Sequence, residues 1–157
     1  MQFFEGLLFY ELVLLVLGVL LFLVLLFALI YSIIKKRDLK VLALFFVLSI
    51  IMIGYPSIQK IKFDNGVVEL EKRTRELKEN PANTAAQNEL TKSLSEIEKR
   101  PTTNPTTLVK IADAQAAIGD TAKALKNIRD ALAVQPDLPQ ANRLRKRIET
   151  PPAGMAR

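Results

Sequence analysis

Two apolar segments decide the fold of this chain: LVLLVLGVLLFLVLLFALIYSII at residues 12–34 and VLALFFVLSIIMIGY at residues 41–55, separated by the basic turn KKRDLK at residues 35–40. The first segment has 23 residues without a charge, and a helix needs about 20 apolar residues to cross a bilayer. The second segment has 15 residues and lies at the lower limit for a span. A buried hairpin in a soluble core is the alternative, but the polar remainder is too small to cover so much apolar surface. We therefore predict a transmembrane hairpin with spans at residues 7–34 and 41–55.

The composition argues against catalysis and against nucleic-acid binding. The chain of 157 residues has no Cys and no His, so thiolate sites and the commonest general base and metal ligand are missing. It has no Gly-rich phosphate loop, no metal-ligand spacing and no nucleophile–base pair. The net charge of +6 comes mostly from a mixed-charge soluble part rather than from a basic stripe. We expect no catalytic residue, no metal, no cofactor and no nucleic-acid partner.

The short turn predicts the orientation of the hairpin. It holds four basic side chains, Lys35, Lys36, Arg37 and Lys40, whereas residues 1–6 hold none. Basic residues in short loops are retained in the cytoplasm. We therefore expect a cytoplasmic turn and extracytoplasmic termini, which in a bacterial inner membrane means a periplasmic C-terminal domain. The N-terminus also lacks the features of a cleaved signal peptide, so the first helix is expected to be retained.

Glu11 is the charged residue at the edge of the first span. Because the uncharged residues after it are sufficient to cross the bilayer, we expect Glu11 at the membrane interface. The alternative is contact with a cationic group on a neighbouring membrane subunit.

The remainder of the chain is divided by Pro and Gly into helical segments. We predict an extended linker at residues 56–65 and a loose tail at residues 150–157. Asp64 or Asn65 is expected to cap the first helix after the linker. The predicted helices span residues 66–79, 84–99, 106–118, 121–134 and 139–149.

Residues 105–138 resemble a tetratricopeptide repeat (TPR), a helix–turn–helix unit of 34 residues. The matching positions are Leu108, Ile111, Ala112, Ala124, Ile128, Ala131 and Pro136. Gln115 stands where the repeat usually has Tyr, which indicates a polar contact or an exposed edge. Partial repeats are expected to open at residues 80–97 and at residues 138–141. The apolar segments predict a two-helix transmembrane hairpin, and the resemblance implies that a short TPR-like α-solenoid of about five helices follows over residues 66–149, so the whole chain is expected to be all-α. A generic helical bundle is the alternative.

The resemblance also implies a concave face that binds a protein or peptide. Its inward-facing residues would be Thr106, Val109, Lys110, Asp113, Ala116 and Ala117. Val109 and Asp113 do not match the residues that capture a C-terminal carboxylate, so a packed helix or an extended segment is the expected ligand. Packing against a neighbouring helix of the same chain is the alternative. The basic run on the last helix, Arg143, Arg145, Lys146 and Arg147, is interpreted as a solvated face rather than as a lipid or nucleic-acid site.

Together these features predict a non-enzymatic, membrane-anchored TPR scaffold or adaptor, a small subunit of a larger membrane complex. It would contact the lipid bilayer and other membrane proteins through its hairpin, and a protein or peptide through its repeat domain. The alternative is an assembly or maturation factor. Its plan is similar to that of cytochrome c maturation proteins with two membrane helices and periplasmic repeats, although their cytoplasmic loop is much longer.

Overall fold

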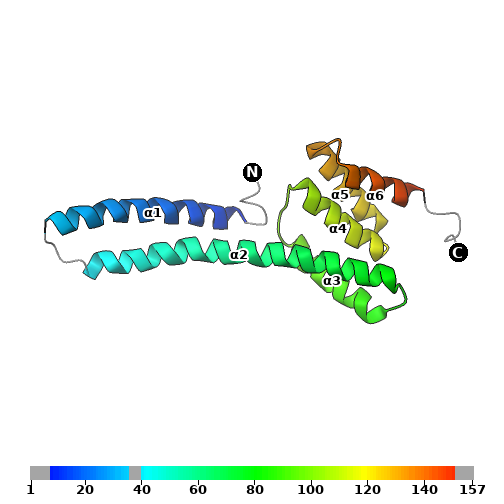
Figure 1. Cartoon of the computed structure of the whole chain (residues 1–157), viewed down its shortest axis with the longest axis horizontal. Coiled ribbons are helices and arrows are strands. Elements are labelled where there is room, and N and C mark those ends of the chain that lie inside the picture. Colours follow the sequence, from blue (N-terminus) through cyan, green and yellow to red (C-terminus); the bar gives the residue numbers. More distant parts are fainter. Residues whose placement is uncertain (1–7, 36–39, 151–157) are drawn as a thin grey trace. The chain divides into compact units, whose positions relative to one another are not determined.

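The computed structural model describes residues 8–35 and 40–150, and within these residues the chain is all-α, as predicted. Its helices are α1 (Phe9–Ile34), α2 (Lys40–Glu79), α3 (Thr84–Glu98), α4 (Pro105–Ala117), α5 (Thr121–Val134) and α6 (Pro139–Glu149) (Figure 1). The described chain divides into two compact units, one ending at Lys62 and the other beginning at Phe63. Helix α2 contributes residues to both.

The first unit is a helical hairpin made of α1 and the first part of α2, which lie side by side (Figure 1). Two helices are long and apolar enough to cross a membrane, with 26 residues in α1 and 38 from Leu42 to the end of α2. Only 11% of each apolar window is buried, whereas the core helix of a soluble protein is mostly buried. The rings of Phe22 and Phe46 join the two helices edge to face, with centroids 5.6 Å apart.

Gly18 allows a close approach of the two hairpin helices. A Cβ atom at this position would lie 3.0 Å from both Ile53 Cγ1 and Met52 Cβ. The buried hydroxyl of Ser49 donates a hydrogen bond of 2.9 Å to the carbonyl oxygen of Gly18. Gly18 has no partner glycine in a G-x-x-x-G pair, so here the small residue serves packing within the chain.

The predicted linker at residues 56–65 is wrong, because α2 continues without a break from Lys40 to Glu79. Pro56 lies inside this helix, where it removes one backbone hydrogen bond. In the following turn the hydroxyl of Ser57 donates to the carbonyl oxygen of Ile53 at 2.9 Å. The carbonyl oxygen that loses its helical donor at Pro56 is that of Met52, four residues earlier.

The predicted helix start near Gly66 is also wrong, as are the caps at Asp64 and Asn65, since all three residues lie within α2. The side of α2 that is buried in the second unit begins at Phe63 and continues with helical spacing. Its members are Phe63, Val67, Leu70, Thr74 and Leu77. Burying this face outweighs the low helix propensity of Asn65 and Gly66, which costs only about 1 kcal/mol per Gly.

The second unit contains two apolar clusters that share α4. The first joins the end of α2 to α3 and α4, through residues such as Leu70, Leu94 and Ile111. The second joins α4 to α5 and α6, through residues such as Ala112 and Ile128. Helices α3 to α6 lie within one residue of their predicted bounds.

Helix α3 packs with the end of α2 and with α4 in one apolar cluster, and the interpretation of residues 80–97 as the opening of a repeat stays a prediction. Four helices bury residues at positions i, i+4 and i+7. The sets are Leu70, Thr74 and Leu77; Leu90, Leu94 and Ile97; Leu108, Ala112 and Gln115; and Ala124, Ile128 and Ala131.

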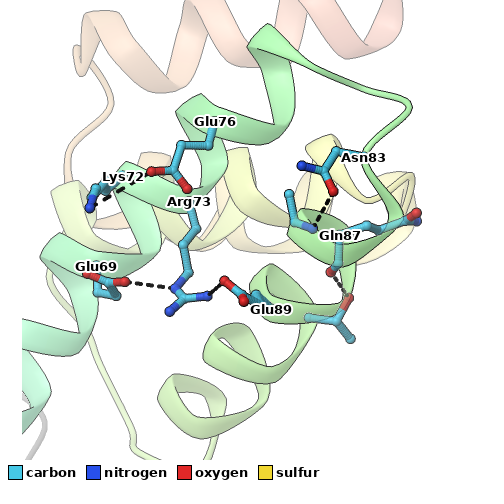
Figure 2. A network of polar contacts seen from close by, with 9 residues as sticks. Glu69, Lys72, Arg73, Glu76, Asn83, Gln87 and Glu89 are labelled. Atoms are coloured by element: carbon cyan, nitrogen blue, oxygen red, sulfur yellow. Dashed lines mark hydrogen bonds and ion pairs between the residues drawn. The ribbon is translucent and has the colours of Figure 1, made fainter.

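Polar contacts join α2 to α3 at the periphery of the second unit (Figure 2). Arg73 on α2 lies between Glu69, whose Oε1 is 2.9 Å from Arg73 Nε, and Glu89 on α3. The side chain of Asn83 accepts a hydrogen bond of 3.1 Å from the N–H of Ala86 and caps α3. The sharp reversal between these helices therefore has both a cap and an ion pair.

The turn between α4 and α5 lies at Gly119 and Asp120, between the helices predicted at residues 106–118 and 121–134. Gly119 has a φ of 87°, a left-handed conformation that glycine adopts without strain. The N–H of Asp120 donates to the carbonyl oxygen of Gln115 at 2.8 Å, and the N–H of Gly119 donates to that of Ala116 at 3.1 Å. These bonds form a Schellman motif. Asp120 then caps α5 by accepting a bond of 3.2 Å from the N–H of Lys123.

Candidate partner-binding groove

A groove of about 620 Å³ in the second unit is the main candidate site. Residues from α2, α4 and α6 line it, so that α4 lies between two helical walls. The lining residues are Glu71, Thr74, Thr106, Val109, Lys110, Asp113, Gln140, Arg143, Leu144 and Arg147.

Four of the six predicted concave-face residues line this groove: Thr106, Val109, Lys110 and Asp113. The other two lie elsewhere on α4. Ala116 packs against the cluster with α5 and α6, whereas Ala117 packs against the cluster with α2 and α3.

Two of the four predicted topology residues, Lys35 and Lys40, lie at the ends of the two hairpin helices that face the turn in the chain. Lys35 is exposed directly after α1, and Lys40 is the first residue of α2. Lys36 and Arg37 fall outside the described residues.

The groove has a buried, largely apolar floor. Val109 and Leu144 are 6% exposed and Thr74 is 3% exposed. The hydroxyl of Thr74 donates to the carbonyl oxygen of Leu70 at 2.7 Å, so this polar group is already satisfied within α2. A bound side chain would therefore meet methyl and methylene groups at the base of the groove.

The carboxylates of the groove are both engaged by cations of the same chain. Lys110 Nζ lies 2.9 Å from Glu71 Oε2, which joins α4 to α2. Asp113 contacts Lys78 on α2 and also accepts a bond of 2.6 Å from an Nη of Arg147 on α6. One carboxylate on α4 thus links both walls.

The predicted solvated face of α6 divides into parts with different surroundings. Arg143 and Arg147, one turn apart, line the groove, whereas the exposed Lys146 does not. Arg145 is half-buried, and its Nε has no hydrogen-bond partner among the described residues. The i, i+4 spacing of the two groove arginines was the signal that could have separated them from the run.

Gln115, the departure from the repeat pattern, makes the predicted polar contact, and the alternative of an exposed edge is wrong. Its side chain is 2% exposed. Its Nε2 donates to Glu98 Oε1 on α3 at 2.7 Å, and its Oε1 accepts from Asn127 Nδ2 on α5 at 2.8 Å. These residues line a second, smaller hollow of about 370 Å³ away from the groove.

Glu11 is fully buried in the first turn of α1. Its Oε2 accepts a hydrogen bond of 3.0 Å from the N–H of Leu8, the N-cap residue. Leu8 has no side-chain oxygen to return the bond, so the carboxylate supplies the polar cap at this helix end. The predicted position of Glu11 at a membrane interface stays a prediction.

Within residues 8–35 and 40–150, no three His, Cys, Asp or Glu side chains are grouped so that they could hold a metal ion. No family model, no curated protein and no solved structure matches the chain.

Proposed function

We propose that this chain is a non-enzymatic, membrane-anchored scaffold or adaptor that binds a partner protein in the groove over α4. The observation that carries the proposal is the groove itself. Its apolar floor lies between charged walls contributed by three helices, an arrangement suited to holding a polypeptide segment.

We also propose that the second unit is a short TPR-like solenoid. Its support is the recurrence of the same buried spacing in successive helices and the sharing of α4 between two clusters. In such a stack each unit buries its apolar face against its neighbours. The first helix of each pair then lines one common side, as α2, α4 and α6 line the groove.

The hairpin supports a place in the membrane. Its exposed side chains are predominantly Leu, Val, Ile and Phe, which suits contact with lipid or with the helices of other membrane proteins. From the basic turn we propose a bacterial inner membrane protein with a cytoplasmic turn and a periplasmic second unit. A C-terminal alkaline phosphatase fusion is expected to be active, because this enzyme needs the periplasm. If a C-terminal reporter that works only in the cytoplasm were active and alkaline phosphatase were not, the orientation would be the opposite of the one proposed.

Photo-crosslinking from the groove tests the proposed function. A photoreactive amino acid at Gln140, which lines the groove, is expected to capture a specific partner in intact membranes. The matched control carries the same group at Ala133, which is exposed on α5 and does not line the groove. Capture at both positions alike, or at neither, would contradict the proposal. A stoichiometric partner favours a complex subunit, whereas a transient one favours an assembly factor.

A further inference from the structure

We propose that the groove receives an acidic segment of the partner protein, with Arg143 as its principal anchor. This inference rests on the proposed function, since it names the chemistry of the partner at the same site.

The groove has an excess of positive charge after its internal ion pairs are counted. Its cationic lining residues are Lys110, Arg143 and Arg147, against the two carboxylates of Glu71 and Asp113. Glu71 is paired with Lys110, and Asp113 is shared by Arg147 and Lys78. Neither carboxylate is available to attract a cationic ligand without losing a partner that it already has.

Of the three cationic side chains that line the groove, Arg143 is the one without a carboxylate partner among the described residues. It is exposed, and it lines the groove one helical turn before Arg147. A polypeptide lying on the floor formed by Val109 and Leu144 would remove water from this guanidinium. Covering a charge without supplying a counter-charge is unfavourable, so the bound segment has to bring its own carboxylate.

The floor also selects among anionic ligands. A lipid headgroup or free phosphate would use the arginines alone, whereas this groove continues from them over buried apolar side chains to the α2 wall. A segment with alternating acidic and apolar side chains satisfies both parts. We therefore assign the site to acidic side chains within a protein segment.

Charge reversal on α6 tests the proposal in the full-length protein in detergent. Arg143→Glu is compared with Lys146→Glu, which changes the net charge equally on the same helix but outside the groove. The probe is a short fluorescent peptide of glutamate and leucine with both ends capped, so that side-chain carboxylates alone are tested. Its counterparts replace each glutamate by glutamine or by lysine.

We expect the glutamate peptide to bind at least tenfold more tightly than the glutamine peptide, and more weakly as salt is added. Arg143→Glu should lower its affinity at least tenfold and should transfer the preference to the lysine peptide. Lys146→Glu should change the affinity less than threefold. Equal effects of the two substitutions overturn the proposal, as does the absence of a preference for the glutamate peptide. If Arg143→Glu abolished binding to phosphatidylglycerol vesicles but left binding of the glutamate peptide unchanged, the proposal would also be overturned, in favour of a lipid ligand.

The crosslink from Gln140 separates this inference from the proposed function. If a captured partner segment, read by mass spectrometry, carries no acidic residue near the crosslink, the acidic assignment fails while the scaffold function stands. If no partner is captured, the scaffold function fails, and the peptide comparison still decides the charge preference of the groove.

Discussion

At the scale of single residues, Gln115 shows how a departure from a family pattern can be structural. A large aromatic side chain is usual at this place in the repeat that the chain resembles. Here the amide connects α3, α4 and α5 by donating to Glu98 and accepting from Asn127. An amide can donate and accept at once, whereas an ionised carboxylate can only accept.

Replacing Gln115 by Ala is expected to destabilise the second unit by about 2 kcal/mol, because buried polar partners lose their hydrogen bonds and a cavity remains. Hydrogen exchange of the amides in α4 and α5 measures this change as faster opening. The control is Gln87→Ala on the exposed side of α3, which should change stability by less than about 0.5 kcal/mol. Equal protection in both variants would show that the buried amide contributes nothing to stability.

Asp120 is expected to make the start of α5 sensitive to acid. The backbone N–H of Lys123, and then its ammonium group, hold the pKa of the Asp120 carboxyl below its ordinary value. A lowered pKa in the folded state means that the ionised form stabilises the cap. This contribution is fully present above the unfolded pKa of about 3.9 and is lost as the pH falls through the lower folded value.

Comparison of the natural protein with Asp120→Asn, which keeps an acceptor but does not titrate, isolates this contribution. The stability advantage of the natural protein, measured by thermal unfolding, should shrink as the pH is lowered from 6 towards 3. A difference that stays constant over this range would show that the carboxylate charge does not act at the cap.

At the scale of elements, α2 shows that Pro and Gly mark helix ends only when nothing else holds the helix together. Pro56 and Gly66 both predicted a break, and both lie inside one continuous helix. The face that begins at Phe63 reaches the core formed with α3 and α4. Because burial of a side chain of this size contributes about 2 kcal/mol, a few such contacts exceed the local cost of these residues.

The hairpin packing is expected to fail when Gly18 is enlarged. Gly18→Leu would place a side chain where Ile53 and Met52 already lie, and overpacking of this kind costs about 1 to 3 kcal/mol. Since the chain has no Cys, cysteines introduced at Phe22 and Phe46 report the approach of the two helices by their oxidation in membranes. The crosslinking yield should fall several-fold.

Gly54→Leu is the matched control, because nothing lies within 4 Å of a Cβ atom built at Gly54. This variant adds the same side chain to the same hairpin and should keep the yield of the parent. Equal losses in both variants would assign the effect to the added leucine rather than to the contact at Gly18.

At the scale of the whole molecule, the basic turn is expected to determine on which side of the membrane the groove lies. Changing Lys35, Lys36, Arg37 and Lys40 to Gln removes the charge difference between the turn and the N-terminus. The activity of a C-terminal alkaline phosphatase fusion should then drop several-fold, because part of the chains insert in the opposite orientation.

A control with the same loss of charge comes from α6. Neutralising Arg143, Arg145, Lys146 and Arg147 should leave the orientation unchanged, since charges in a long domain have little influence on insertion. If the turn variant kept its full reporter activity, the orientation would be determined by another part of the chain.

The sequence by itself determined the features that depend on neighbouring residues. An uninterrupted apolar run is enough to predict a helix that can span a membrane, because length and composition decide that property. The bounds of α5 and α6 could be predicted from the Pro and Gly residues that divide this part of the chain, and the structure adds the cap at Asp120. These signals act over a few residues and need no distant partner.

Only the tertiary structure decided which helices share a core and which side chains share a groove. The continuity of α2 depends on contacts with α3 and α4, and the joint position of Glu71, Asp113 and Arg143 depends on three helices meeting. Residues far apart in the chain come together through packing, and a periodic pattern records which face is buried but not which partner covers it.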